Sequence, residues 1–479
     1  SLPATPKRER ARRAGVRMDL AGNVRARATH FADAFGATAT ALNLPLAACG
    51  LSVQVVDVAT CEVSNVEILS LPITTLAYAD AKLIGEEASD FAGSSVSDAG
   101  DVNNDGFDDV LIGAHRNDRG GTDAGVAYLL LGPIGGDIDL ADADAKLTGA
   151  APGDSAGFSV SGAGDVNADG FDDLLIGADH SDTGGTLAGA AFLVLGPVSG
   201  DVSLAAADAI LIGEGTDNYA GVAVSGAGDV DDDGFDDILV GASLNHAGGV
   251  TDAGAAYLLL GPVSGAIDLA SADAKLRGES RDDWAGSAVA AAGDVDGDGF
   301  DDLLVGATLN DAGGTDAGAA YLVLGPASGS VSLSDAEARL TGEATGDYAG
   351  GTVSGAGDVN GDGFDDLLIG APEHDAVAND EGAAYLVLGP VSGDLSLVLA
   401  DAKLVGERAY HSAGNSVSGA GDVDGDGFHD VLVGTGSANT AYLVLGALSG
   451  YIDLADADAI LLGEAGDIAG NSVSGAGDM

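Results

Sequence analysis

The sequence predicts an all-β protein: a seven-bladed β-propeller of four-stranded blades, six complete and the seventh split between the chain ends and incomplete. Three observations support this fold class. One phrase recurs along most of the chain, each repeat contains four strand-like segments separated by turn signals, and the two ends carry complementary pieces of one repeat. Helical periodicity is absent through the repeats.

The repeat is long and regular. Its aspartate phrase, GDVNGDGFDDLLIGA and variants of it, starts at Asp101, Asp165, Asp229, Asp294, Asp358 and Asp422, with spacings of 64, 64, 65, 64 and 64 residues. A seventh copy begins at Asp478. A unit of this length is too large for one coil of a leucine-rich solenoid and is typical of a propeller blade.

Each unit contains four short strand patterns in a fixed order. A small-residue segment such as SVSGAG precedes the aspartate turn, and an aliphatic segment such as DDLLIGA follows it. After a Gly-rich loop come GAAYLVLG, a Gly-Pro or Gly-Ala turn, and a last strand such as AKLTGE. Strands near a propeller axis have little room, which suits Ser, Gly and Ala, while Leu, Ile, Val and Tyr fill the wider space between blades.

The chain ends predict how the ring closes. Residues 77–86, AYADAKLIGE, have the form of a fourth strand, and residues 471–479, NSVSGAGDM, have the form of a first strand. If both belong to one blade, the ring leaves no free sheet edge. We therefore expect a basic leader at 1–48, disordered or acting as a signal region, an N-terminal extension at 49–75 that holds up to two strands, and the propeller at 76–479, truncated in its seventh repeat.

Charge and cysteine content exclude several classes of protein. The 479 residues include 76 Asp and Glu against 18 Lys and Arg, a formal charge of −58, which disfavours nucleic acid and anionic membrane surfaces as partners. Two cysteines exclude a disulfide framework or a Cys-rich zinc module. No run of 18 apolar residues occurs, so no membrane-spanning helix is expected.

The leader carries a weak export signal. A modest apolar stretch from Phe35 follows several arginines and ends in Leu46-Ala47-Ala48-Cys49-Gly50, which resembles a bacterial lipobox. Cys49 is then a lipid anchor; the alternatives are a free cysteine or a bridge to Cys61. Either interpretation favours an extracellular or cell-surface location.

The aspartate phrase D-x-[DN]-x-D-G-x-x-D predicts metal binding. Side chains at positions 1, 3, 5 and 9 and the carbonyl of position 7 can close an oxygen cage around a hard cation, and glycine at position 6 permits the sharp turn. The expected ligands are Asp101, Asn103, Asp105, Phe107 and Asp109; Asp165, Asn167, Asp169, Phe171 and Asp173; Asp229, Asp231, Asp233, Phe235 and Asp237; Asp294, Asp296, Asp298, Phe300 and Asp302; Asp358, Asn360, Asp362, Phe364 and Asp366; and Asp422, Asp424, Asp426, Phe428 and Asp430.

All-oxygen ligation by a flexible loop favours Ca²⁺ over Zn²⁺ and Mg²⁺, and about six sites are expected. Strands rather than helices flank the loops, and an aliphatic residue stands at position 12, where an EF-hand needs glutamate. The alternative is an acidic turn that binds no metal. Crowded carboxylates repel one another, so we expect binding to stabilise the fold.

The aspartate turn followed by DDLLIGA and GAAYLVLG resembles the FG-GAP repeats of bacterial surface proteins and of the integrin alpha-chain N-terminal propeller. The resemblance covers residues 77–479, although Ala-Gly replaces Phe-Gly and the Gly-Ala-Pro triplet survives only at Gly370-Ala371-Pro372. It implies a seven-bladed propeller with Ca²⁺ loops on one face and ligands on the opposite face.

That opposite face should carry aromatic side chains in the turns before each first strand and histidines in the loops between the second and third strands. These are Phe91, Tyr219, Trp284, Tyr348 and Tyr410, with His115, His180, His246 and His374. They either grip a protein or glycan ligand, or the aromatic residues cap the spaces between blades while the histidines are solvated.

No catalytic constellation stands out: H-E-x-x-H does not occur, and the G-x-S-x-G match at residues 153–157 precedes a small-residue strand pattern instead of opening a helix, so it is no nucleophile elbow and we expect no enzyme activity. Two functions remain, a Ca²⁺-stabilised adhesion-type surface module and the non-catalytic propeller of a larger secreted hydrolase or phospholipase.

Overall fold

A computed structural model describes residues 73–76, 79–376, 379–464 and 468–477, and five short strands before them. The chain divides into two compact units, residues 1–72 and 73–479. The first unit contains a three-stranded sheet of β1 (Val16–Met18), β2 (Val24–Ala26) and β3 (Asn43–Leu44), and an antiparallel pair of β4 (Val53–Val56) and β5 (Val63–Val66). Cys49 and Cys61 lie outside the described residues, so the lipid anchor and the leader stay predictions.

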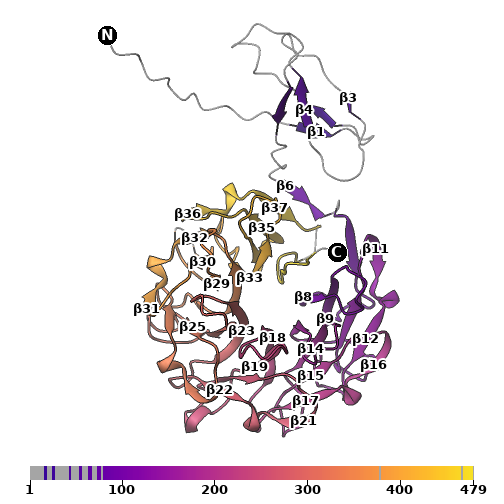
Figure 1. The fold of residues 1–479 in the computed structure, drawn as a ribbon, viewed down its shortest axis with the longest axis vertical. Coiled ribbons are helices and arrows are strands. Elements are labelled where there is room, and N and C mark those ends of the chain that lie inside the picture. Colours follow the sequence, from indigo (N-terminus) through magenta and orange to yellow (C-terminus); the bar gives the residue numbers. More distant parts are fainter. Residues whose placement is uncertain are drawn as a thin grey trace. The chain divides into compact units, whose positions relative to one another are not determined.

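The second unit is all-β and has a propeller arrangement of six blades, whose sheets follow one another around a ring (Figure 1). No α-helix occurs among its described residues, and none of the helical turns described in the chain has the length and apolar character needed to cross a bilayer. Each repeat supplies four antiparallel strands, with the small-residue strand innermost. The predicted order of strands within each repeat is confirmed.

The strands of blades 1 to 6 have the following bounds: β8 (Ser95–Gly100), β9 (Asp109–Ala114), β10 (Val126–Leu130) and β12 (Ala145–Thr148); β13 (Val160–Gly164), β14 (Asp173–Ala178), β15 (Ala190–Val194) and β17 (Ala209–Ile212); β18 (Ala220–Gly228), β19 (Asp237–Ala242), β20 (Ala255–Leu259) and β22 (Ala274–Arg277); β23 (Ala285–Gly293), β24 (Asp302–Ala307), β25 (Ala319–Val323) and β27 (Ala338–Thr341); β28 (Thr352–Gly357), β29 (Asp366–Ala371), β30 (Ala383–Val387) and β32 (Ala402–Val405); β33 (Ala413–Gly421), β34 (Asp430–Thr435), β35 (Thr440–Val444) and β37 (Ala459–Leu462).

The blades have five strands, one more than the sequence predicted. After the Gly-Pro or Gly-Ala turns of repeats 2 to 6 the chain adds a short parallel strand to the outer edge of the preceding blade, so blades 1 to 5 also contain β16 (Gly200–Ser203), β21 (Gly265–Asp268), β26 (Gly329–Ser332), β31 (Gly393–Ser396) and β36 (Gly450–Asp453). In blade 6 the same outer position is held by β6 (Ile73–Thr75), from the start of the second unit. The five strands that follow a turn are short and largely exposed, so they lack the apolar pattern that reveals a strand. They cover edges that would otherwise be free.

Short 3₁₀ turns follow five of these outer strands and β11 (Gly136–Asp139), and they bury one leucine each. Their bounds are Leu140–Asp142, Leu204–Ala206, Leu269–Ser271, Leu333–Asp335, Leu397–Leu399 and Leu454–Asp456, and a further 3₁₀ turn spans Ala247–Gly249. Two strands stand apart from the six sheets: β7 (Ala81–Ile84) pairs in parallel with β11 (Gly136–Asp139).

The cores lie between neighbouring sheets. Between blades 4 and 5, for example, Leu304, Leu322 and Leu340 pack with Leu367 and Ile369. Near the axis, serine hydroxyls replace apolar contacts: Ser95 Oγ accepts a hydrogen bond from the Val160 amide at 3.0 Å, and Ser159 Oγ accepts one from the Val224 amide at 3.1 Å. The innermost strands therefore use serine for hydrogen bonding between blades as well as for its small size.

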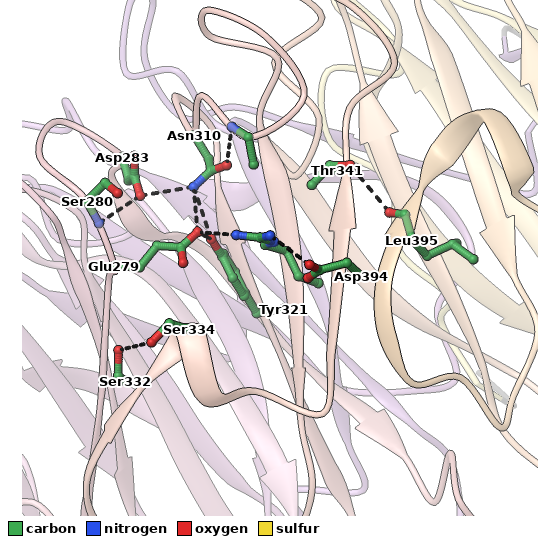
Figure 2. A network of polar contacts seen from close by, with 12 residues as sticks. Glu279, Ser280, Asp283, Asn310, Tyr321, Ser332, Ser334, Thr341, Asp394 and Leu395 are labelled. Carbon is green, nitrogen blue, oxygen red and sulfur yellow. Dashed lines mark hydrogen bonds and ion pairs between the residues drawn. The ribbon is translucent and has the colours of Figure 1, made fainter.

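A polar network joins adjacent blades on the side away from the aspartate turns (Figure 2). Glu279 Oε1, at the end of blade 3, accepts hydrogen bonds from Tyr321 Oη at 2.7 Å and from Arg339 Nη1 at 2.9 Å, both on blade 4. Asn310 Nδ2 also donates to Tyr321 Oη at 3.0 Å. Burial alone would raise the pKa of Glu279, but the hydrogen bonds from Tyr321 and Arg339 outweigh it, and the pKa lies below its ordinary value.

The network recurs with Glu86, Tyr128 and Lys146, but blade 2 replaces all three groups with apolar side chains. Ala150 stands where the glutamate would be, and Phe192 lies opposite Ile210 on the strands that elsewhere hold tyrosine and the cation. Phe192 and Ile210 join the apolar core between blades 1 and 2. The sequence thus contains both a polar and an apolar version of the same interface.

The polar and apolar versions of this interface predict the outcome of substitutions in blade 4. Glu279→Ala alone should lower the free energy of unfolding by about 2 kcal/mol, because Arg339 and Tyr321 lose their shared acceptor. The triple variant Glu279→Ala, Tyr321→Phe, Arg339→Ile should lie within about 1 kcal/mol of the parent, because it reproduces blade 2. Urea unfolding measures both, with the exposed Asp335→Ala, outside the network, as control. A triple variant as unstable as the single one would contradict this account.

Candidate metal centres

Six aspartate loops connect the first and second strands of the six blades and therefore lie on one face of the propeller. We number them loop 1 (101–109), loop 2 (165–173), loop 3 (229–237), loop 4 (294–302), loop 5 (358–366) and loop 6 (422–430). Each follows the innermost strand and leads directly into the buried aliphatic strand. The repeat therefore presents the same residues at the same place in every blade.

The first aspartate shapes each loop. Asp101 Oδ1 accepts a hydrogen bond from the Asp105 amide at 2.9 Å, and its Oδ2 accepts one from the Gly106 amide at 2.8 Å. The same two bonds recur in all six loops. Glycine at position 6 has a positive φ of 92° in loop 1, which a side chain would disfavour. The carboxylate of position 1 thus faces the inside of a tight turn.

Positions 1, 3 and 9 come together in the three loops that have aspartate at position 3. Ligand oxygens of Asp229, Asp231 and Asp237 lie within 4.8 Å of one another. The same holds for Asp294, Asp296 and Asp302, and for Asp422, Asp424 and Asp430. Loops 1, 2 and 5 have an asparagine at position 3, whose amide oxygen is the corresponding donor. Three of the predicted ligand positions therefore converge where all are carboxylates.

The ninth position is buried at the base of each loop and holds the blade together. Asp237 Oδ2 accepts a hydrogen bond from the Val230 amide at 2.9 Å, and Oδ1 accepts one from the Gly261 amide, in the turn after the third strand, at 2.8 Å. Equivalent pairs occur in the other five loops. The sequence indicated a ligand here but not this second, structural role.

Burial changes the protonation of these ninth-position carboxyl groups. It raises the pKa of Asp109, Asp237, Asp302 and Asp366 to about 6, and that of Asp173 to about 7. Burial also raises the pKa of Asp430. Neighbouring carboxylates in the same loop add to the effect. Keeping these groups ionised near neutral pH therefore costs free energy unless a positive charge lies beside them.

Positions 5 and 7 are hydrogen-bonded to each other within each loop. Asp233 Oδ1 accepts a hydrogen bond from the Phe235 amide at 3.1 Å, and the same contact recurs in the other loops. Asp233, Asp298 and Asp426 are not members of the three carboxylate clusters. The structure thus groups positions 1, 3 and 9, while metal binding by positions 5 and 7 stays a prediction.

The residues present fit a hard divalent cation. Two position-3 oxygens, Asn103 Oδ1 and Asp231 Oδ1, are buried and have no hydrogen-bond partner, although buried oxygens normally have one. Both belong to the predicted ligand sets. The donors are carboxylate and amide oxygens without nitrogen or sulfur, which favours Ca²⁺ over Zn²⁺. A cation at these loops would give the unpartnered oxygens a partner and would offset the cost of ionising the buried carboxyl groups.

Sequence reasoning missed the residue before each ninth position. Asp172, Asp236, Asp301 and Asp365 do not point into their own loops; each accepts a hydrogen bond from the loop of the preceding blade. The doubled aspartate in the phrase FDD was the available signal, since only one of the pair fits the ligand pattern. Position 4 was also missed: Asn104, Ala168 and Asp232 all adopt a positive φ there.

The predicted aromatic residues lie at the turns before the first strands, on the face away from the aspartate loops. Phe91, Tyr219, Trp284, Tyr348 and Tyr410 all have a positive φ, between 54° and 65°, which is uncommon for bulky side chains. Phe91 is 50 % exposed and Tyr410 61 % exposed. They therefore present aromatic surface instead of only sealing the gaps between blades.

The histidines differ from one another. His115 lies 5.5 Å from both Phe91 and Phe158, ring centre to ring centre, and His180 lies 5.6 Å from Tyr219. His374 is only 4 % exposed; Lys403 Nζ donates to its Nε2 at 2.8 Å, and its Nδ1 donates to Asp347 at 3.0 Å. Both predictions for His374, a ligand contact or a solvated side chain, are therefore wrong: it belongs to the polar network between blades.

Comparison with known proteins agrees with this geometry. The FG-GAP repeat family matches residues 92–130, 156–194, 285–323 and 349–387. The chain is 32 % identical over 171 residues to integrin alpha-PS5 of Drosophila melanogaster, covering 35 % of this chain and 16 % of the relative. It is 33 % identical over 174 residues to integrin alpha-4 of Xenopus laevis, with the same coverage, and 29 % identical over 233 residues to integrin alpha pat-2 of Caenorhabditis elegans, covering 46 % of this chain and 18 % of the relative.

The matched relatives are much longer than the aligned region, which spans less than a fifth of each of them. Within that region the repeated aspartate loop, the order of strands and the ring of sheets all agree with the family match. The chain therefore contains FG-GAP repeats in four of its blades, and its propeller is similar to the matched region of integrin alpha chains.

Proposed function

We propose that the chain is a calcium-dependent, non-enzymatic interaction module of the adhesion type that works outside the cell or at its surface. The observation that carries the proposal is the convergence of carboxylates in the aspartate loops of an integrin alpha-like propeller. The unpartnered oxygens of Asn103 and Asp231 support a cation at these loops. The likeness to integrin alpha chains supports the adhesion role and the extracellular location.

In this proposal the side chains at positions 1, 3, 5 and 9 and the carbonyl at position 7 hold about six Ca²⁺ ions. A bound ion supplies positive charge that offsets the repulsion among the carboxylates. The ninth aspartate connects that charge to the fold, because it also fixes the turn after the third strand. Extracellular modules of this kind bind Ca²⁺ with dissociation constants on the order of 10⁻⁴ to 10⁻³ M, which matches the supply outside cells.

Calcium should therefore stabilise the propeller. We expect the thermal unfolding midpoint to rise by about 5 °C or more between excess chelator and 5 mM Ca²⁺, because each site then contributes about 1 to 2 kcal/mol at a roughly fivefold to fiftyfold excess over its dissociation constant. Differential scanning calorimetry measures the midpoint, and equal Mg²⁺ serves as the ion control. Asp231→Ala should reduce the rise, whereas its neighbour Asp232→Ala should not. Equal midpoints in chelator and in Ca²⁺ would refute the metal sites.

We also propose that residues 79–86 and 471–477 form a seventh, split blade that lacks its two middle strands. β6 pairs in parallel with β37, as β16 does with β12, and Lys82 contacts Glu464 at 2.8 Å, as Lys146 contacts Glu86 at 2.9 Å.

The inner edge repeats the pattern as well. Ser472 Oγ accepts a hydrogen bond from the Val96 amide at 3.2 Å, and Ser474 Oγ accepts one from the Asp98 amide at 3.3 Å. Leu432 and Leu443 of blade 6 are partly exposed, while their counterparts Leu368 and Leu386 in blade 5 are fully buried. This difference fits the missing middle strands.

Truncation after residue 470 tests the split blade. Removing the segment should speed hydrogen exchange at the Val96 and Asp98 amides at least tenfold, because both lose their serine acceptors. The equivalent amides of Val224 and Gly226, bonded to Ser159 and Ser161, should not change and serve as internal controls. Unchanged exchange at Val96 and Asp98 would contradict the proposed blade.

The partner is proposed to be a protein that binds the face opposite the aspartate loops, where Phe91, Trp284 and Tyr410 are exposed at strained turns. Exposed aromatic side chains with restricted backbones are typical anchors of protein interfaces. Residues holding positive φ values lose little further entropy when a ligand binds.

Partner binding should depend on both calcium and the aromatic face. The double variant Trp284→Ala, Tyr410→Ala should lose at least tenfold in affinity for whichever immobilised extracellular-matrix protein the parent binds in surface plasmon resonance, and chelator should lower binding further. Tyr451→Ala, 60 % exposed on the outer strand β36, is the matched control. If the parent bound only glycans on an array, the partner would be a carbohydrate and not a protein. If the double variant bound as well as the parent, the aromatic face would not be the binding site.

A further inference from the structure

One aspartate in each of loops 2 to 5 forms a hydrogen bond with the loop of the preceding blade. We call Asp172, Asp236, Asp301 and Asp365 the bridging aspartates; each stands directly before the ninth position of its own loop. Their Oδ2 atoms accept hydrogen bonds from the amides of Asp101 at 2.7 Å, Asp165 at 2.7 Å, Asp229 at 3.0 Å and Asp294 at 2.9 Å. Those amides belong to the first aspartate of the neighbouring loop, which shapes that loop around its proposed cation.

The connection also runs in the other direction. The Asp236 amide donates to the Asp165 carbonyl at 3.3 Å, and the Asp365 amide donates to the Asp294 carbonyl at 3.2 Å. Both backbone groups of a first aspartate are thus held by the next blade. Gly164, just before Asp165, leaves no room for a side chain, because a Cβ there would overlap the Asp236 carboxylate. The backbone of loop 2 and the side chain of Asp236 therefore pack in direct contact.

Other contacts reinforce the same interface. Asn104 Nδ2 donates to the Gly170 carbonyl at 2.8 Å, which joins loop 1 to loop 2. At loops 4 and 5 the Phe364 ring lies against Gly297, where a Cβ would overlap it. Each loop is therefore ordered partly by the loop that follows it around the ring.

The bridging carboxylates also share the charge of two loops. Asp236 accepts the amide hydrogen bond of Asp165, a proposed ligand of loop 2, and directly precedes Asp237, a proposed ligand of loop 3. Positive charge in either loop would therefore act on a carboxylate that is already bonded to both loops. An ion bound in one loop can therefore affect the conformation of the neighbouring loop through the bridging carboxylate.

We propose that the bridging aspartates couple the metal loops of adjacent blades, so that loops 1 to 5 bind Ca²⁺ cooperatively, each loop raising the affinity of the next one on either side. This inference rests on the proposed calcium sites and adds their regulation. Coupling between binding sites is reciprocal, so loss of a bridge weakens both loops that it joins. None of the bridging aspartates is itself a predicted ligand.

The coupling ends at blade 6, where histidine replaces the bridging aspartate. The His429 amide still donates to the Asp358 carbonyl at 3.1 Å, and the imidazole lies over Gly357, but the carboxylate is absent. Loops 5 and 6 therefore keep the backbone bond and the packing of the Phe428 ring against Gly361, but they lack the carboxylate bridge. The chain thus contains its own comparison: four carboxylate bridges and one position without a carboxylate.

The experiment follows calcium binding loop by loop in the full chain. Hydrogen exchange read by mass spectrometry at graded Ca²⁺ gives a protection midpoint for each loop in the parent, Asp236→Ala, His429→Asp and the control Asp232→Ala. The control removes the same charge from exposed position 4 of loop 3, where loop 2 naturally has Ala168. Calorimetric titration with Ca²⁺ gives the number of sites and the Hill coefficient.

We expect Asp236→Ala to raise the midpoint of loop 2 at least fivefold, although no ligand of loop 2 has changed, and to lower the Hill coefficient. Loop 5 should keep its midpoint in that variant, and His429→Asp should lower the midpoint of loop 5. A loop 2 midpoint equal to that of Asp232→Ala overturns the coupling while leaving the calcium sites intact. Absence of calcium-dependent protection in every loop of the parent overturns the sites themselves, and the coupling with them.

Discussion

The buried carboxylate at the base of each aspartate loop is the constraint on which the rest of the propeller depends. Asp237 and its equivalents are fully buried, and each bonds to two backbone amides that fix the loop and the turn after the third strand. An ionised group in that position must be compensated, because burial raises its pKa toward neutrality. The same carboxylate thus links the loop face to the interior of the blade. A change in the charge at the loop therefore also changes the stability of the sheet.

Contacts between blades use different chemistry at different radii. Serine hydroxyls join the innermost strands, aliphatic layers fill the middle, and the network of glutamate, tyrosine and lysine or arginine joins the blades on the face away from the loops. Blade 2 replaces that network with Phe192 and Ile210 and still packs in the same register. The interface therefore requires matched partners rather than any particular polarity, as expected when a half-removed polar network leaves buried groups unsatisfied.

The two faces of the propeller differ in their physical character. The loop face is densely acidic, and its residues are arranged to share charge around the ring, which suits ions better than macromolecules. The opposite face presents aromatic side chains held at positive φ, next to histidines of which one, His374, is fully engaged inside the protein. The loop face therefore contributes to the stability of the propeller, while the aromatic face is exposed to a partner.

The sequence by itself determined the repeat, the order of strands and the aspartate pattern, because each is a local property: period-two strand patterns, turn residues, and ligands within nine residues of one another. Tertiary structure decided what depends on neighbouring blades. The fifth strand could not be seen in advance because its residues are exposed and pair with another repeat, as Gly200–Ser203 pairs with β12. The role of Asp236 was hidden for the same reason, since its hydrogen-bond partner, the Asp165 amide, is 71 residues away in the chain and adjacent only in the ring.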